Sequence, residues 1–473
     1  MDSSPSAPAN LPLTQRNQFV ARLLAVQPCP SGPPYTSSLQ ISRDDPYPIP
    51  GPNEVCIRSR AVGLNHIDWK NLEHEIMVKQ WPEILGFEIA GVVEMIGMDV
   101  KDSELRVGLP VLGLSGPVGM RGGPPGKGEP EGPGGPGDKT DKTLEEQGMR
   151  VGRAGGFQDV TCVHKSMVTR KPANWNFAWA AGAPLVYITA CSAIVCGLGI
   201  QLPFLARNTK PSLDSTTSLL HLDSLNIDDE FKRTSAVNKL RVKSVLVLGG
   251  SSGVGGAVIQ LLRMALGPMA VIITMTNNKN YYRELRDRGA TAHLSGQYEG
   301  LVEKVRFLTG GRGVDAIVDC ISGAACLELP PIPQSPTPSA DYDPDTDKIT
   351  IKKEPGSDEE AAMEDIPEFQ PVTFWDVFRK DGPKLYAEVA TGRKVNVPTD
   401  RGIKAKLVFS KMILSTPGGE GALKALPALV EGGKFVFPHP GGVKVVGKGL
   451  ESIAKGLAEL REGSGGVKFV VEV

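Results

Sequence analysis

A glycine-rich turn between an apolar strand and an amphipathic helix constrains the fold of this chain more than any other feature. Residues 242–262 read VKSVLVLGGSSGVGGAVIQLL, in which the apolar run Val245–Leu248 gives way to glycine and serine. Apolar side chains then return at helical spacing, at Val254, Ala257, Val258, Leu261 and Leu262. Strand, tight turn and helix in this order form the first unit of a dinucleotide-binding α/β fold.

The residues of this turn have separate predicted roles. Gly250 is expected to allow the sharp turn out of the strand, and Gly253 to let the backbone approach a pyrophosphate. Gly255 and Gly256 are expected to let the helix pack close to the sheet, while the helix N-terminus presents N–H groups to the phosphates. Ser252 replaces the middle glycine of G-x-G-x-x-G, and a purely structural strand–helix turn is the alternative. The predicted cofactor-binding residues here are Gly250, Ser251, Ser252, Gly253, Val254 and Gly255.

The next unit indicates which dinucleotide is bound. A second strand is predicted at Ala270–Thr274 and a helix at Tyr281–Arg288, and no Asp or Glu lies between Val271 and Arg283. An acidic side chain after this strand binds the ribose 2′-OH and repels a 2′-phosphate. Donors and one cation stand there instead, which favours NADP(H) over NAD(H); a solvated loop is the alternative. The predicted cofactor contacts are Asn277, Asn278, Lys279 and Tyr282, with Ser322 after a further strand at Val314–Ile321.

Length and composition limit the number of domains, the kinds of partner and the location of the protein. A length of 473 residues predicts two or more domains, and 40% apolar residues supply a core. The net charge of −1 does not indicate a nucleic-acid partner, so none is expected, and seven scattered Cys without C-x-x-C are expected to be buried thiols. No apolar run approaches the roughly 20 residues of a membrane span, so a cytoplasmic location without membrane contact is expected. The oligomeric state stays open.

Four segments are expected to be disordered. Residues 1–18 resemble a leader without an apolar region. Residues 117–138 contain nine Gly and six Pro, and this insert is expected to extend to residue 150. Two further inserts are predicted at 201–240, which is polar without a strong period, and at 328–370, which is rich in acidic residues. These inserts would interrupt a smaller fold.

Segments in the remaining chain resemble the medium-chain dehydrogenase/reductase superfamily, in its zinc-lacking branch of quinone-oxidoreductase-like and fungal trans-acting enoyl reductases. The resemblance rests on Pro52–Val55, Gly63–Lys70 (GLNHIDWK), Leu85–Gly91 (LGFEIAG), Gly155–Gln158 and Leu185–Ala190, together with the glycine turn. It implies an α/β protein with a GroES-like, partly β-barrel catalytic domain at 19–185. A Rossmann domain with a doubly wound parallel sheet would follow at 186–425, and residues 426–473 would return to the first domain.

The same resemblance bears on zinc. Zinc-dependent relatives place Cys, His and Cys around the catalytic metal, and these positions fall here on Asn65, Phe87 and Leu185. None of these side chains is a good zinc ligand, and Glu88 alone would not hold the ion. We therefore expect no metal, which disfavours metal-polarised alcohol oxidation.

The chemistry that remains is hydride transfer from NADPH to an activated C=C, in an enoyl thioester or enone, or to a quinone. Candidate catalytic residues are Asn65, Lys70, Tyr187 and Thr189, and the resemblance places Thr189 near the nicotinamide as well. A packing role for Tyr187 and an ordinary helix hydroxyl for Thr189 are the alternatives, and the proton donor stays open. The substrate would be a small molecule, with a carrier-bound thioester from a polyketide synthase as one candidate. A cofactor-binding but inactive interaction or sensing module is the alternative function.

Overall fold

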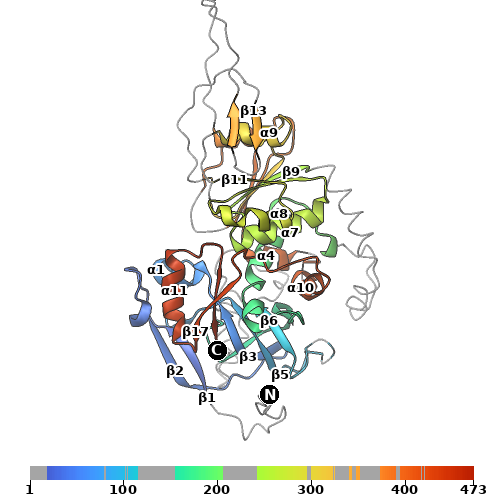
Figure 1. Ribbon diagram of the computed structural model, residues 1–473. Coiled ribbons are helices and arrows are strands. Elements are labelled where there is room, and N and C mark those ends of the chain that lie inside the picture. Colours follow the sequence, from blue (N-terminus) through green and yellow to red (C-terminus); the bar gives the residue numbers. More distant parts are fainter. Residues whose placement is uncertain are drawn as a thin grey trace, which may run out of the picture. The chain divides into compact units, whose positions relative to one another are not determined.

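The computed structural model describes residues 19–78, 81–101, 103, 105–115, 155–205, 242–295, 300–322, 324, 340–343, 348–351, 373–389, 395–416, 418–419 and 421–473. The chain divides into two compact units (Figure 1). Unit 1 comprises Met1–Ile188 and Lys411–Val473, and unit 2 comprises Thr189–Ser410. The predicted leader, the whole insert at 117–150 and residues 206–240 lie outside the described residues, so their disorder stays a prediction.

Unit 1 is built on a mostly antiparallel sheet. Its path is β17 (Val443–Lys448), β18 (Lys468–Glu472), β3 (Glu54–Gly63), β5 (Glu88–Ile96), β6 (Pro110–Leu114) and β8 (Val168–Arg170), with β7 (Val160–His164) paired to β3. A second sheet contains β2 (Leu39–Pro46), β1 (Phe19–Ala25) and β4 (Glu83–Ile84). The alternating apolar residues of β3 and β5 point into one core, which confirms the expected GroES-like domain.

The C-terminal segment completes this unit. Helix α11 (Ser452–Glu462) packs against α1 (His66–His74) and against β17, so opposite ends of the chain lie side by side (Figure 1, red beside blue). Helix α10 (Gly421–Glu431) also belongs here, because it packs on β8 and Glu431 forms an ion pair with Arg170. The two units of the structure meet in the chain at 188/189 and 410/411, whereas the predicted boundaries are 185/186 and 425/426.

Unit 2 is the expected Rossmann domain. Its parallel sheet has the order β11 (Ala292–Leu294), β10 (Val271–Met275), β9 (Ser244–Leu248), β12 (Ala316–Asp319), β15 (Leu385–Val389) and β16 (Lys404–Val408). The described helices are α7 (Gly253–Leu266), α8 (Tyr282–Asp287) and α9 (Leu301–Leu308). Strands β9 and β12 are buried throughout, as expected for central strands of a parallel sheet.

Three expectations about segments need correction. Cys56 and Cys162 lie directly opposite each other on β3 and β7 and form a disulfide, so this pair is not free. Within the insert at 328–370, Ala340–Asp343 and Lys348–Ile351 form the antiparallel strands β13 and β14. The second strand contains β-branched Ile349, Thr350 and Ile351, which favour extended backbone.

The third correction concerns membrane spans. Phe177–Gly197 is one segment of 21 residues that is long and apolar enough to cross a membrane, contrary to expectation. However, 78% of its apolar window is buried inside the structure, as in the core helix of a soluble protein, so the evidence for a span is weak. The segment is divided into α3 (Phe177–Ala181), α4 (Pro184–Ser192) and a π-helical turn, η5 (Ala193–Gly197).

Candidate functional site

The glycine turn at the carboxyl end of β9 is shaped by close backbone approach. The left-handed residue of this turn is Gly249, with φ of 79°, and Gly250 follows it in the same turn. A Cβ on Gly250 would instead lie 1.7 Å from Thr274 Oγ1 on β10. A Cβ on Gly255 would lie 2.2 Å from the carbonyl oxygen of Gly249, which confirms close packing of the helix on the turn.

The start of α7 has the features of an anion site. Ser252 is the N-cap, and its hydroxyl accepts a hydrogen bond from Gly255 N–H at 3.0 Å. The first N–H groups of an α-helix have no intrahelical acceptor, and here these belong to Gly253 and Val254. Together with the helix dipole, they can bind a phosphate.

The loop after β10 lies beside this turn. Gly249 N–H and Gly250 N–H both donate to the carbonyl of Met275, and Thr276 Oγ1 donates to Ser251 Oγ at 2.6 Å. Strands β9 and β10 are parallel neighbours, so both loops stand at the carboxyl edge of the sheet, where such sheets bind ligands. The turn and the loop are therefore brought together as the sequence predicted.

The side chains of this loop that were predicted to contact the cofactor differ in whether they are exposed or already in contact with the protein. Asn277 and Lys279 are exposed. Asn278 accepts a hydrogen bond from Asn280 N–H at 3.1 Å, and the ring of Tyr282 stacks on His293. Asn277 and Lys279 are thus the side chains best placed to meet a ligand, whereas Asn278 and Tyr282 shape the loop.

Ser322 lies at the end of β12 but does not face solvent. It is fully buried, has a positive φ of 50°, and its hydroxyl donates to Glu388 Oε1 at 3.3 Å. Burial raises the pKa of Glu388, and the Ser322 hydroxyl opposes that change. The structure therefore joins Ser322 to β15, and its cofactor contact stays a prediction.

A buried polar cluster lies in unit 1. Lys468 Nζ donates to Asn65 Oδ1 at 2.7 Å and to Glu88 Oε2 at 2.5 Å. Asn65 Nδ2 donates to Glu88 Oε2 at 2.9 Å and to the Gly63 carbonyl at 3.4 Å. Both amide hydrogens of Asn65 are thus used within the protein, and the amide has none left to orient a substrate carbonyl in this conformation.

Lys468 is the member of this cluster that sequence reasoning missed. It lies 380 residues from Glu88 and 403 residues from Asn65, and no local motif marks it. Its ammonium donates to both Asn65 and Glu88, and Asn65 is one of the positions compared above with a zinc site. Phe87 is buried, and Leu185 contributes its backbone N–H to Glu88 Oε1 at 2.7 Å. In the part of the chain that the structure describes, no group of three or more His, Cys, Asp or Glu could hold a metal ion.

Asp68 borders the same cluster. Its carboxylate accepts hydrogen bonds from Asn65 N–H at 2.8 Å and from Gly86 N–H at 3.2 Å. Complete burial raises the pKa of Asp68 to about 7, against the lowering effects of these N–H groups and of Lys468. Asp68 therefore joins the start of α1 to the turn before β5.

The other predicted catalytic residues have contacts of their own. Tyr187 is fully buried, donates its hydroxyl to the Ala422 carbonyl at 3.0 Å and packs edge-on against Phe435, which supports its packing alternative. Lys70 lies over the Trp69 ring at 5.6 Å. Thr189 is buried on α4, and its place near a nicotinamide stays a prediction.

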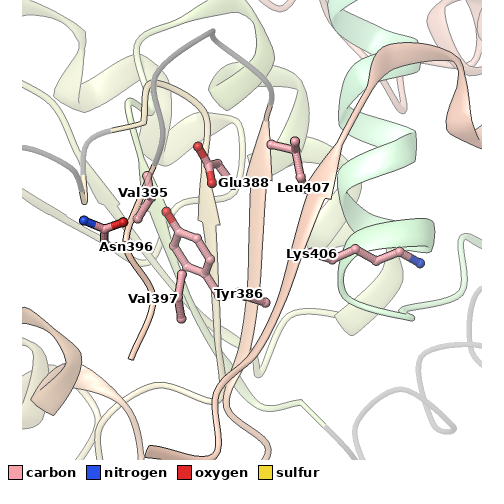
Figure 2. A pocket seen from close by; sticks show the side chains of 8 residues that line it. Tyr386, Glu388, Val395, Asn396, Val397, Lys406 and Leu407 are labelled. Carbon is pink, nitrogen blue, oxygen red and sulfur yellow. The ribbon is translucent and has the colours of Figure 1, made fainter. Parts of the chain in front are cut away.

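A cavity of about 390 Å³ lies elsewhere in unit 2, on β15 and β16 (Figure 2). Tyr386 and Glu388 point toward the segment Val395–Val397, while Lys406 points away from it. No predicted site residue lines this cavity, so we do not identify it with the predicted cofactor site.

Comparison with known proteins gives one family match. Residues 51–173 match the alcohol dehydrogenase GroES-like domain. The chain is 25% identical to dehydrogenase orsE of Emericella nidulans, over 91% of this chain and 94% of that protein. It is 23% identical to trans-enoyl reductase BOA5 of Botryotinia fuckeliana, over 62% of this chain and 66% of that protein.

A solved structure shows the same fold. The quinone oxidoreductase of Coxiella burnetii aligns with a TM-score of 0.55 and 18% identity, covering 96% of this chain and 99% of that one. At this identity the likeness concerns the fold alone.

Proposed function

Because the chain belongs to the medium-chain dehydrogenase/reductase superfamily, we propose that this oxidoreductase is NADPH-dependent and zinc-independent. Its substrate would be an enoyl thioester, an enone or a quinone. One observation carries the proposal: the loops after β9 and β10 are hydrogen-bonded to each other at the carboxyl edge of the sheet. The first of these loops provides an anion site, and the second contains no Asp or Glu.

The residues present fit a dinucleotide. Gly250 and Gly255 leave no room for a side chain against Thr274 and Gly249, so the turn packs tightly against β10 and the start of α7. Gly253 and Val254 N–H would bind the phosphates, and Lys279 with Asn277 would bind the 2′-phosphate. NADPH, when bound, supplies a hydride to the β-carbon of an activated double bond or to a quinone.

Cofactor choice gives a first test. Lys279→Ala should raise the Kd of NADPH by roughly 10- to 100-fold and leave that of NADH nearly unchanged, because only NADPH has the 2′-phosphate. Fluorescence titration of both cofactors measures this. Lys243→Ala is the matched control, since Lys243 is exposed just before the amino end of β9, at the opposite edge of the sheet. Equal Kd values for the two cofactors in the wild type would refute the preference.

Metal independence gives a second test. An amide, a phenyl and an alkyl side chain stand at Asn65, Phe87 and Leu185, and none of them suits Zn²⁺ at these positions. Turnover should survive prolonged treatment with EDTA, and elemental analysis should find less than stoichiometric zinc. Loss of turnover that added zinc restores would show that the protein holds a catalytic metal.

The reaction itself is tested with a substrate panel. The name of the relative BOA5 supports a trans-acting enoyl reductase, whose substrate would be a thioester held on a carrier. Enoyl thioesters, enones and quinones should be offered with NADPH, and the nicotinamide absorbance followed. We expect turnover of at least one class. If NADPH binds and every class stays unreacted, an inactive sensing or interaction module becomes the better reading.

A further inference from the structure

The buried cluster of Lys468, Glu88 and Asn65 joins six elements of the chain. These are the end of β3, the start of α1, the start of β5, the end of α3, the start of α4 and the start of β18. Resting on the reductase function proposed above, we propose that Lys468 is a positioning residue. Through Glu88 it holds the first turn of α4, the helix that carries Tyr187 and Thr189.

The charges of this pair depend on each other. The side chain of Glu88 is 0% exposed and that of Lys468 is 3% exposed. A buried charge without its partner is strongly unfavourable, whereas a buried pair with all its hydrogen bonds is tolerated. Lys468 therefore supplies the partner charge for the buried carboxyl group of Glu88, which accepts hydrogen bonds on both oxygens.

The side chain of Glu88 makes a specific contact at the start of α4. Glu88 Oε2 accepts from Lys468 and Asn65, so Oε1 is directed at Leu185 N–H, 2.7 Å away. Leu185 is the second residue of α4, where an N–H lacks an intrahelical acceptor and a negative charge is favourable. The pair thus caps the N-terminus of α4 from another strand.

Two glycines make room for this arrangement. A Cβ on Gly63 would lie 2.8 Å from Glu88 Oε2 and 2.2 Å from the Ala181 carbonyl oxygen. A Cβ on Gly182 would lie 2.8 Å from Lys468 Cγ. The backbone on both sides of the pair is therefore close-packed, and a small change in the pair would be transmitted to the start of α4.

The decisive variant is the double substitution Lys468→Met with Glu88→Gln. It removes both charges together and avoids the isolated buried charge that either single change would leave. Hydrogen exchange over residues 184–192 should become about 10-fold faster, which corresponds to loss of one charge-assisted hydrogen bond. The peptide over 253–266 serves as internal reference and should stay unchanged. The kcat should fall by about 10-fold or more, with the NADPH Kd within about twofold.

Two further variants serve as controls, one at Lys468 itself and one at another lysine. Lys468→Arg retains the charge and should keep the protection of 184–192 and most of the kcat. Lys444→Met removes a lysine on neighbouring β17 whose partner, Glu459, lies at the surface, and it should behave as wild type. If the double variant does not fold, Lys468→Met alone decides: faster exchange over 184–192 with a lower kcat supports the proposal, and wild-type exchange and kcat overturn it.

The outcomes separate this proposal from the proposed function. Wild-type exchange at 184–192 and wild-type kcat in a folded double variant would overturn the role of Lys468. If the wild-type protein reduces none of the panel, the reductase function fails. The exchange measurement then still decides whether Lys468 positions α4.

Discussion

Replacing Gly255 by valine should abolish NADPH binding and destabilise unit 2. Any Cβ at this position would lie 2.2 Å from the Gly249 carbonyl oxygen and 2.8 Å from Gly250 Cα, and both atoms belong to the backbone of the turn. The helix can accept the side chain only by moving away from β9, which we expect to cost about 3 kcal/mol or more. The N–H groups of Gly253 and Val254 would move with it. Thermal unfolding and NADPH fluorescence titration measure the two effects.

A glycine whose Cβ would meet a flexible side chain, and no backbone atom, serves as the control. A Cβ on Gly51 would meet only the flexible side chain of Glu54, 3.2 Å from its carboxylate oxygen. Gly51→Ala should therefore leave both the unfolding temperature and the NADPH Kd close to wild type. If Gly255→Val bound NADPH as tightly as Gly51→Ala, the close approach of backbone and pyrophosphate would be wrong.

Asp68 should make the protein more stable at mildly acidic pH than at neutral pH. Burial of the whole carboxyl group raises its pKa from the ordinary 3.8 to about 7 in the folded protein. A group whose pKa rises on folding contributes stability that is complete below its unfolded pKa and is lost as the pH rises through the folded one. The loss should therefore fall between about pH 4 and pH 7 and approach about 4 kcal/mol.

Asp68→Asn isolates this contribution, because the amide is neutral at every pH. The difference in free energy of unfolding between wild type and Asp68→Asn should change in favour of the variant as the pH rises from about 4.5 to 8. Denaturant unfolding at several pH values measures it, and other titrating groups cancel in the difference. A difference that stays constant over this range would show that Asp68 is ionised throughout.

Residues close together in the chain carried most of what could be predicted from sequence. The glycine turn, the strand on either side of it and the acid-free loop after β10 each depend on neighbours within one βα unit. The predicted strand at 270–274 and helix at 281–288 thus agree closely with Val271–Met275 and Tyr282–Asp287. Steric and hydrogen-bonding preferences of this kind act over a few residues and leave a pattern in the sequence.

The details of the site depended on contacts between distant residues. The sequence suggests that the Asn65 amide binds a substrate, but in the structure this amide is hydrogen-bonded to Lys468 and Glu88. The sequence also suggests Tyr187 as an acid, but its hydroxyl donates to the Ala422 carbonyl and its ring packs against Phe435. Cys56 meets Cys162 only because β3 pairs with β7 in one register. By itself the sequence determined the α/β class, the dinucleotide turn and the acid-free loop. Only the tertiary structure decided which polar side chains are hydrogen-bonded to other residues of the protein. Burial and pairing between distant residues leave no pattern of spacing in the sequence.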